Sequence, residues 1–171
     1  MMQTEAQPPP AAGDPSSEAR SSRRAQWRAV EDEFAAGLTN YWYALVPSDE
    51  VGARPLALTR LGEDLVLWRD GDGKPRLFPD ACAHRGTRLS LGRVAGGALH
   101  CCYHGWTYDG EGNVLAVLPE GPESKIPGKV KARVYPTQTL RGMVFVWMGE
   151  GEPAPIEEDV PPEFFHNHGL V

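Results

Sequence analysis

Two short stretches of sequence decide the fold of this chain: Cys82-Ala83-His84 and Cys101-Cys102-Tyr103-His104. Each stretch offers one thiol and one imidazole, two positions apart in the first and three positions apart in the second. Sixteen residues (85–100) separate the two stretches. Thiolate is a ligand for iron–sulfur clusters, zinc and copper, and imidazole is a ligand for iron, zinc and copper. The pattern therefore predicts a metal centre held between two loops.

The mixture of ligand types within each stretch favours two unlike irons over a single zinc. A mononuclear zinc site with two cysteines and two histidines normally takes both cysteines from one stretch and both histidines from the other. In a Rieske 2Fe–2S centre, two cysteines hold one iron and two histidines hold the other. Two loops that each give one cysteine and one histidine suit such a cluster. A non-redox zinc-binding module is an alternative.

The same stretches, with the residues that follow them, resemble the Rieske domain of Rieske non-haem iron oxygenases. Arg85-Gly86 follows the first histidine, and Gly105-Trp106 follows the second. The resemblance covers residues 38–149 and implies the Rieske iron–sulfur fold of small antiparallel sheets with a cluster-binding subdomain. It implies a Rieske 2Fe–2S cluster as cofactor, with the ligands Cys82, His84, Cys101 and His104.

Smaller details resemble the carbazole dioxygenase-like members of these aromatic ring-hydroxylating oxygenases. They are Lys125-Ile126-Pro127-Gly128, Tyr135-Pro136-Thr137 and Asp159-Val160-Pro161-Pro162. Respiratory Rieske proteins differ: they carry a disulfide between the loops and a serine after the second His-Gly. This chain has Thr87, Tyr103 and Trp106 at those positions. The resemblance thus implies a reduction potential toward the low end of the Rieske range of roughly −150 to +300 mV.

Three neighbours of the predicted ligands need separate interpretation. If Cys102 replaced Cys101 as ligand, the gap would grow to 17 residues, and the family spacing favours Cys101. We expect Cys102 to point into the β core as a small apolar residue. His100 has no role in the family pattern, and we expect a hydrogen-bonding or surface residue. Tyr108 matches a tyrosine that can donate to a ligand sulfur, and an ordinary strand aromatic is the alternative.

The rest of the central region is predicted to consist of short strands separated by turns. The β-prone runs are 41–46, 56–60, 65–69, 76–78, 114–118, 134–135 and 140–148. Asp70-Gly71-Asp72-Gly73 predicts a hairpin turn between two of them. Short strands at close spacing with glycine-rich turns indicate an all-β domain.

The flanking segments differ from this region in composition. Residues 1–26 are rich in Pro, Ala, Ser and Arg, and we expect a disordered tail. Trp27, Val30 and Phe34 recur at helical spacing and predict a short helix over residues 27–37. Residues 150–171 begin with acidic residues and prolines, so they are expected to be an acidic, proline-rich linker or tail.

Composition and charge also limit the expected classes of partner and the expected compartment. The net charge of −6 argues against nucleic acid as the main partner. No apolar run approaches the length of a membrane span, so no membrane is expected. Three cysteines are too few for a disulfide framework, and two belong to the metal pattern, which favours a reducing cytoplasm.

The resemblance implies that the chain is an oxidoreductase component that transfers electrons. In the family, a ferredoxin or reductase supplies electrons to the Rieske domain. A mononuclear Fe(II) in a larger catalytic domain, or in a neighbouring subunit, then receives them and hydroxylates an organic, aromatic substrate; the full-length subunits form homotrimers.

We expect that catalytic domain to be absent here, so that this chain relays electrons without oxygenating by itself. His166 and His168 lie near Glu163, and we interpret them as solvated tail. A stand-alone Rieske ferredoxin is the alternative.

Overall fold

A computed structural model of the protein describes residues 21–22, 24–28 and 37–165. The chain divides into two units, Met1–Gly37 and Leu38–Val171. In the first unit, residues 21–22 and 24–28 are helical, so helix begins within the expected tail, where Arg24, Ala25 and Gln26 are good helix formers. Most of the predicted helix, residues 29–36, lies outside the described residues, as do residues 1–20 and 166–171. None of the described helices has the length and apolarity that a bilayer crossing requires.

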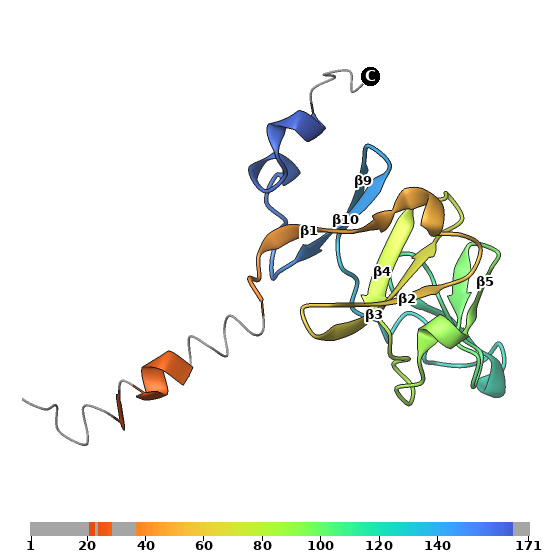
Figure 1. The fold of residues 1–171 in the computed structure, drawn as a ribbon. Helices are drawn as coiled ribbons and strands as arrows, with labels where there is room; N and C mark the ends of the chain where they lie inside the picture. The colour runs from red at the N-terminus through yellow and green to blue at the C-terminus, as the bar shows by residue number, and fades with distance from the viewer. Residues whose placement is uncertain (1–20, 23, 29–36, 166–171) are drawn as a thin grey trace, which may run out of the picture. The chain divides into compact units, whose positions relative to one another are not determined.

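Three antiparallel sheets make up the second unit (Figure 1). Their strand orders are β1-β10-β9, β2-β3-β4 and β5-β6-β7-β8. The strands are β1 (Tyr41–Pro47), β2 (Leu56–Arg60), β3 (Glu63–Arg69), β4 (Pro75–Pro79), β5 (Arg93–Ala95), β6 (Ala98–His100), β7 (Trp106–Tyr108), β8 (Val114–Val117), β9 (Thr137–Leu140) and β10 (Met143–Met148). Short 3-10 helices connect them: η1 (Ser48–Glu50), η2 (Leu89–Leu91), η3 (Leu118–Glu120), η4 (Ile156–Glu158) and η5 (Pro162–Phe164). The predicted all-β fold is confirmed.

The predicted strand pattern omits β5, β6 and β7, and it is wrong at two of the predicted runs. The run expected at 140–148 contains a two-residue turn, Arg141-Gly142, which divides it into the end of β9 and all of β10. Both turn residues have positive φ, 48° and 76°, as a tight hairpin turn between twisted strands requires. Residues 134–135 form no strand, because Tyr135 makes only an isolated bridge with Leu77.

Strand β3 separates two hydrophobic cores, and this explains why its central residues 65–68 are apolar without alternation. Leu65 and Leu67 belong to the core between the first two sheets. Val66 and Trp68 point to the opposite face, into the core that also contains Cys82. Successive side chains of a strand face opposite sides, so a strand buried on both faces is apolar at every position. The second core is thereby placed directly beneath the metal-binding loops.

The acidic C-terminal segment, predicted to be a linker or tail, packs onto the first sheet over residues 154–165. Ile156 and Val160 are buried in a cluster with Trp42 of β1. The backbone N–H of Trp42 donates to Asp159 Oδ2 at 2.8 Å, and its indole Nε1 donates to the Ala154 carbonyl at 2.7 Å. The apolar residues among the acids and prolines account for this packing.

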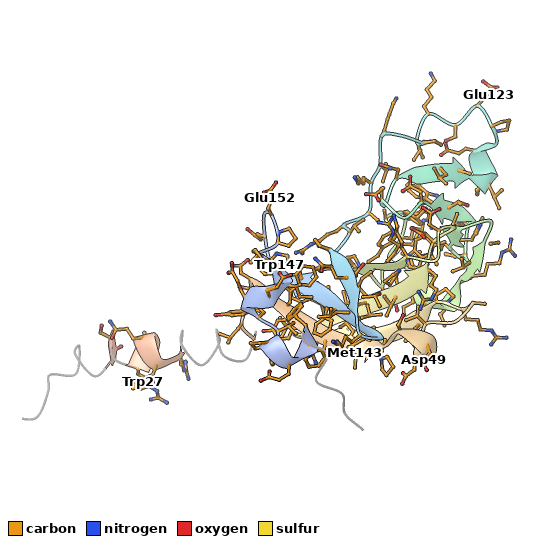
Figure 2. All side chains as sticks on the ribbon, turned by 90° about the horizontal axis from the view of Figure 1, so that it is seen from above. Trp27, Asp49, Glu123, Met143, Trp147 and Glu152 are labelled. Carbon is orange, nitrogen blue, oxygen red and sulfur yellow. The ribbon has the colours of Figure 1, made fainter. Side chains whose placement is uncertain are left out.

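Figure 2 shows Glu123, in the loop after η3, at the end of the domain opposite Met143 and Trp147 of β10.

We predict that replacing Asp70 with asparagine reduces stability at neutral pH and flattens its acid dependence. The Asp70 carboxylate accepts hydrogen bonds from the backbone of Asp72 and Lys74 and from Arg76 Nε, the last at 2.7 Å. Burial acts to raise the pKa of Asp70, but the hydrogen bonds and the charge of Arg76 outweigh it, and the pKa is lowered. A carboxyl with a lowered folded-state pKa contributes stability above its unfolded-state pKa and loses it as pH falls through the folded-state value.

The free energy of unfolding in urea, measured for both proteins at pH 6 and near pH 3, checks this prediction. Asp70→Asn should cost about 1 kcal/mol at pH 6. The difference between the two proteins should begin to shrink as the pH falls below the ordinary aspartate pKa of about 3.9, toward the lowered folded-state pKa. An equal difference at both pH values would contradict the assignment of acid sensitivity to Asp70.

Candidate metal centre

The first predicted ligand stretch forms a tight loop after β4. The Cys82 backbone N–H donates to the Thr87 carbonyl at 2.8 Å, and the Cys82 carbonyl accepts from Gly86 N at 2.8 Å. Gly86 has φ 68°, a left-handed conformation that glycine adopts without steric cost. This turn projects His84 outward while Cys82 faces the core beneath it. The turn needs a residue that tolerates positive φ at position 86, which explains the glycine after Arg85.

The second ligand stretch, between β6 and β7, repeats the same hydrogen-bond pattern. The Cys101 N–H donates to the Trp106 carbonyl at 2.8 Å, and the Cys101 carbonyl accepts from Gly105 N at 3.2 Å. Gly105 has φ 65°. A Cβ there would also lie 2.3 Å from Cδ1 of Leu118, but that side chain is exposed and can move, so the positive φ is the main reason for glycine. Each cysteine is thus held at the start of a glycine turn of the same geometry.

These two turns bring the four predicted ligands together in two pairs. The side chains of Cys82 and Cys101, 4% and 5% exposed, lie in the same buried core cluster, close enough for Cys82 to affect the pKa of Cys101. The rings of His84 and His104 face each other at the surface, with centroids 4.7 Å apart and planes at 68°. Within the described residues, no three side chains from His, Cys, Asp and Glu converge on one metal position. Each loop contributes one member of each pair.

The electrostatics of the two pairs differ. Burial raises the pKa of the Cys101 thiol, and the adjacent Cys82 raises it further. Hydrogen bonds from the backbone amides of Tyr103 and His104 act to lower this pKa, but the net pKa is raised. Partial desolvation lowers the pKa of His104, and the positive charges of His84 and Arg85 act in the same direction. The imidazole therefore favours its neutral, metal-binding form. The thiols must lose their protons when a metal binds.

Aromatic side chains surround the site. The ring of His84 stacks on Trp106, with centroids 5.1 Å apart and an interplanar angle of 2°. Tyr108 Oη lies 3.1 Å from Cys82 Sγ and accepts a hydrogen bond from Ala83 N at 3.1 Å. Because that oxygen already accepts from an amide, its own proton is free to donate to the sulfur. Burial and the neighbouring Cys82 thiol raise the pKa of Tyr108, so the donor keeps its proton.

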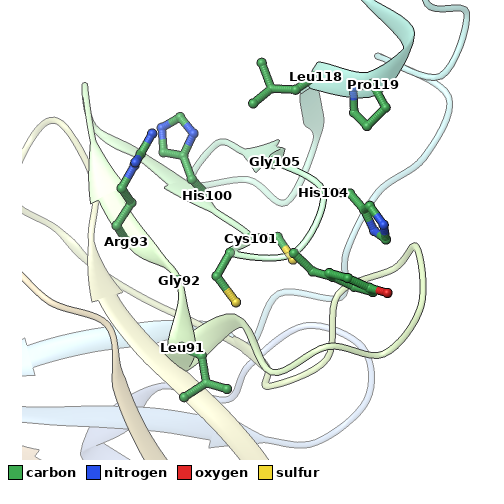
Figure 3. A pocket seen from close by; sticks show the side chains of 11 residues that line it. Leu91, Gly92, Arg93, His100, Cys101, His104, Gly105, Leu118 and Pro119 are labelled. Atoms are coloured by element: carbon green, nitrogen blue, oxygen red, sulfur yellow. The ribbon is translucent and has the colours of Figure 1, made fainter.

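Two neighbours of the ligands can now be assigned. The prediction that Cys102 points into the core is wrong, because its side chain is exposed. Strand β6 ends at His100, so Cys102 lies in a turn where strand alternation no longer applies. The prediction for His100 is confirmed, since its ring nitrogens lie 3.1 Å from the Ala95 carbonyl and 3.0 Å from Thr107 Oγ1. Cys102 and His100 line a surface pocket beside the site with Leu91, Gly92, Arg93, Cys101, Tyr103, His104, Gly105, Leu118 and Pro119 (Figure 3).

The family model of the Rieske [2Fe-2S] domain matches residues 41–136. The chain belongs to the Rieske family. Its cofactor is a Rieske 2Fe–2S cluster, and the two thiols and two imidazoles of this Rieske domain are the donor set that such a cluster requires.

Similar proteins include oxygenase components of dioxygenases. The Rieske domain is 39% identical over 132 residues to the terminal oxygenase component of carbazole 1,9a-dioxygenase from Metapseudomonas resinovorans, covering 75% of this chain and 34% of that protein. It is 39% identical over 120 residues to the α subunit of phenoxybenzoate dioxygenase from Ectopseudomonas oleovorans, covering 70% and 29%. The reduced complex between oxygenase and ferredoxin in carbazole 1,9a-dioxygenase matches with a TM-score of 0.74 at 36% identity, covering 88% of this chain and 39% of that one. The chain thus spans about a third of the length of these relatives.

We predict that Tyr108→Phe lowers the reduction potential of the Rieske centre. Removing the hydroxyl deletes a hydrogen bond to Cys82 Sγ, and a donor to sulfur stabilises the more negative, reduced state. A hydrogen bond of roughly 1 kcal/mol corresponds to about 40 mV for a one-electron couple. Redox titration followed by electron paramagnetic resonance measures the shift.

The matched control is Tyr135→Phe. Tyr135 is also buried, and its hydroxyl donates to Glu63 Oε2 rather than to a predicted ligand. The reduction potential of the Tyr135→Phe variant should equal that of the wild type. Equal potentials for Tyr108→Phe and wild type would show that the tyrosine hydroxyl does not act on the ligand sulfur.

Proposed function

We propose that Cys82 and Cys101 bind the inner iron, and His84 and His104 the outer iron, of the 2Fe–2S cluster. The observation that carries this proposal is the pairing of like side chains from unlike loops. Two thiols in the core and two imidazoles at the surface suit one iron with two cysteines and another with two histidines. When bound, the cluster accepts and releases single electrons.

We further propose that this domain supplies electrons to an oxygenase reaction. A ferredoxin, or a reductase, is the donor class, which the likeness to oxygenase–ferredoxin complexes supports. The acceptor is a mononuclear iron of a catalytic domain or a neighbouring subunit, in a homotrimeric full-length assembly. The names of the relatives, carbazole and phenoxybenzoate dioxygenases, support an aromatic substrate. The exposed histidine pair is the side of the site that an acceptor can approach. A reducing compartment such as the cytoplasm suits the free thiols.

Metal and sulfide analysis of the anaerobically purified protein tests the site. We expect a red-brown protein with two irons and two labile sulfides per chain and a Rieske-type resonance after reduction. A colourless protein that binds one zinc would contradict the proposal.

A turnover assay tests whether this stretch transfers electrons without oxygenating a substrate. Residues 1–171, mixed with a ferredoxin, its reductase, NADH and O2, should cycle between oxidised and reduced spectra while carbazole stays unchanged. O2 activation needs an iron with open coordination positions, and the two sulfides together with the four proposed ligands would leave the cluster irons none. Product formed in proportion to electron input would contradict a purely electron-transferring role for this stretch.

A further inference from the structure

A buried side-chain pair closes the base of the first ligand loop. Asp80 lies just before Cys82, and Ser90 lies just beyond the loop in η2. The Asp80 carboxylate is 4% exposed and accepts two hydrogen bonds from Ser90, from its backbone N–H at 2.7 Å and its hydroxyl at 2.6 Å. Hydrogen bonds to a buried charged acceptor are among the stronger ones in proteins. This pair, the first clamp, ties together the two ends of the segment that carries His84.

A second buried polar side chain closes the base of the other loop. Thr107 is 7% exposed, and its hydroxyl donates to the Gly105 carbonyl at 3.2 Å. The same oxygen lies 3.0 Å from Nδ1 of His100, whose Nε2 lies 3.1 Å from the Ala95 carbonyl. A hydroxyl has one proton, so donation to Gly105 makes Nδ1–H of His100 the donor to Thr107, and in that neutral tautomer Nε2 carries no proton for the Ala95 carbonyl. This arrangement, the second clamp, ties the loop to His100 at the end of β6.

The histidines depend on these clamps more than the cysteines do. Cys82 and Cys101 are enclosed by core side chains such as Leu89 and Leu99, so packing fixes them. His84 is exposed and His104 is half-exposed, so the loop backbone must fix their positions. The residue after His104 is Gly105, whose N–H and carbonyl are both engaged, by Cys101 and Thr107.

We infer that Thr107, through Gly105, is a positioning residue for His104, and that the Asp80–Ser90 clamp positions His84. The inference rests on the proposed function, because it needs the two histidines to be ligands. The clamps set the orientation of the imidazoles relative to the cluster and thereby its resonance spectrum and reduction potential. The hydrogen bonds of the clamps join Asp80 to Ser90, and Thr107 to Gly105 and His100, and none of these residues is a proposed ligand.

The test compares variants of the full chain in cluster content, resonance spectrum and midpoint potential. Thr107→Val removes the hydroxyl while keeping the branched shape, and Thr107→Ser keeps the hydroxyl. Ser90→Ala removes one of the two hydrogen bonds of the first clamp. The matched control is Thr137→Val, because Thr137 in β9 also donates its hydroxyl to a backbone carbonyl, that of Pro75 at 2.7 Å, away from the site.

We expect every variant to retain two irons and two sulfides per chain. Thr107→Val and Ser90→Ala should shift the g values and the midpoint potential, while Thr107→Ser and Thr137→Val should match the wild type. Wild-type spectra and potentials in both clamp variants would overturn the inference and leave the cluster assignment standing. A wild-type protein without an iron–sulfur cluster would overturn both. If Thr107→Val fails to assemble a cluster, the milder Ser90→Ala decides.

Discussion

Cys101→Ser should abolish cluster binding, whereas Cys102→Ser should keep the full iron content. Cys101 is buried against Cys82, while the side chain of its neighbour Cys102 is exposed in the turn that follows. A thiolate is the ligand form of cysteine, and a serine hydroxyl does not deprotonate to replace it near neutral pH. Loss of one of the two proposed cysteine ligands would leave the inner iron without half of its protein ligands. Iron and sulfide analysis with visible absorption measures the result.

The two adjacent cysteines serve as controls for each other. Both variants remove one sulfur within the same turn, so a general effect of substitution would affect them alike. If Cys102→Ser lost the cluster and Cys101→Ser kept it, the ligand register of the second loop would be shifted by one residue. Loss in both variants would indicate that the turn tolerates no change, and Cys102→Ala would then test its exposed side chain alone.

Gly92→Ala should destabilise the domain strongly and disturb the loop that carries Cys101. A Cβ at Gly92 would lie 2.1 Å from the His100 carbonyl oxygen and 2.9 Å from that of Leu89. Both neighbours are backbone atoms, so neither can rotate away as a side chain would. His100 precedes Cys101, and relief of the clash must move the strand that places this cysteine. Overpacking of this kind costs about 1–3 kcal/mol.

The matched control is Gly52→Ala, where a Cβ would meet nothing within 4 Å. That substitution should be neutral or slightly stabilising, because alanine restricts the unfolded chain. Urea unfolding gives the free-energy difference, and loss of visible absorbance with time gives cluster retention. Similar stabilities for the two variants would mean that β5 and β6 separate at little cost.

The chemistry of the site could be predicted from the sequence because it resides in local spacing. The glycines after His84 and His104, and the cysteines two and three residues before those histidines, define turns that close on themselves. Such turns depend little on the rest of the chain. The hairpin at residues 70–73 was predictable for the same reason.

The unpredicted features depend on contacts between distant residues. The exposure of Cys102 follows from the end of β6, a boundary set by pairing with other strands. The packing of Ile156 and Val160 follows from an apolar patch around Trp42, more than a hundred residues earlier in the chain. The Asp80–Ser90 pair had one visible signal, a polar residue at each end of a metal-binding stretch. Neither propensity nor periodicity identifies the partners in such contacts.

The topology of the first sheet has a consequence for how the protein is made. Strand β1 pairs with β10, joining Tyr41 to Met148, and Figure 1 shows the orange β1 beside the blue β10. Both ligand loops and the strands β5–β8 lie between them in the sequence. On a ribosome, the ligand-bearing segment emerges and can close its local hairpins while β1 still lacks its partner. The segment that carries both ligand loops is therefore complete in the growing chain before β10, the partner of β1, has been made.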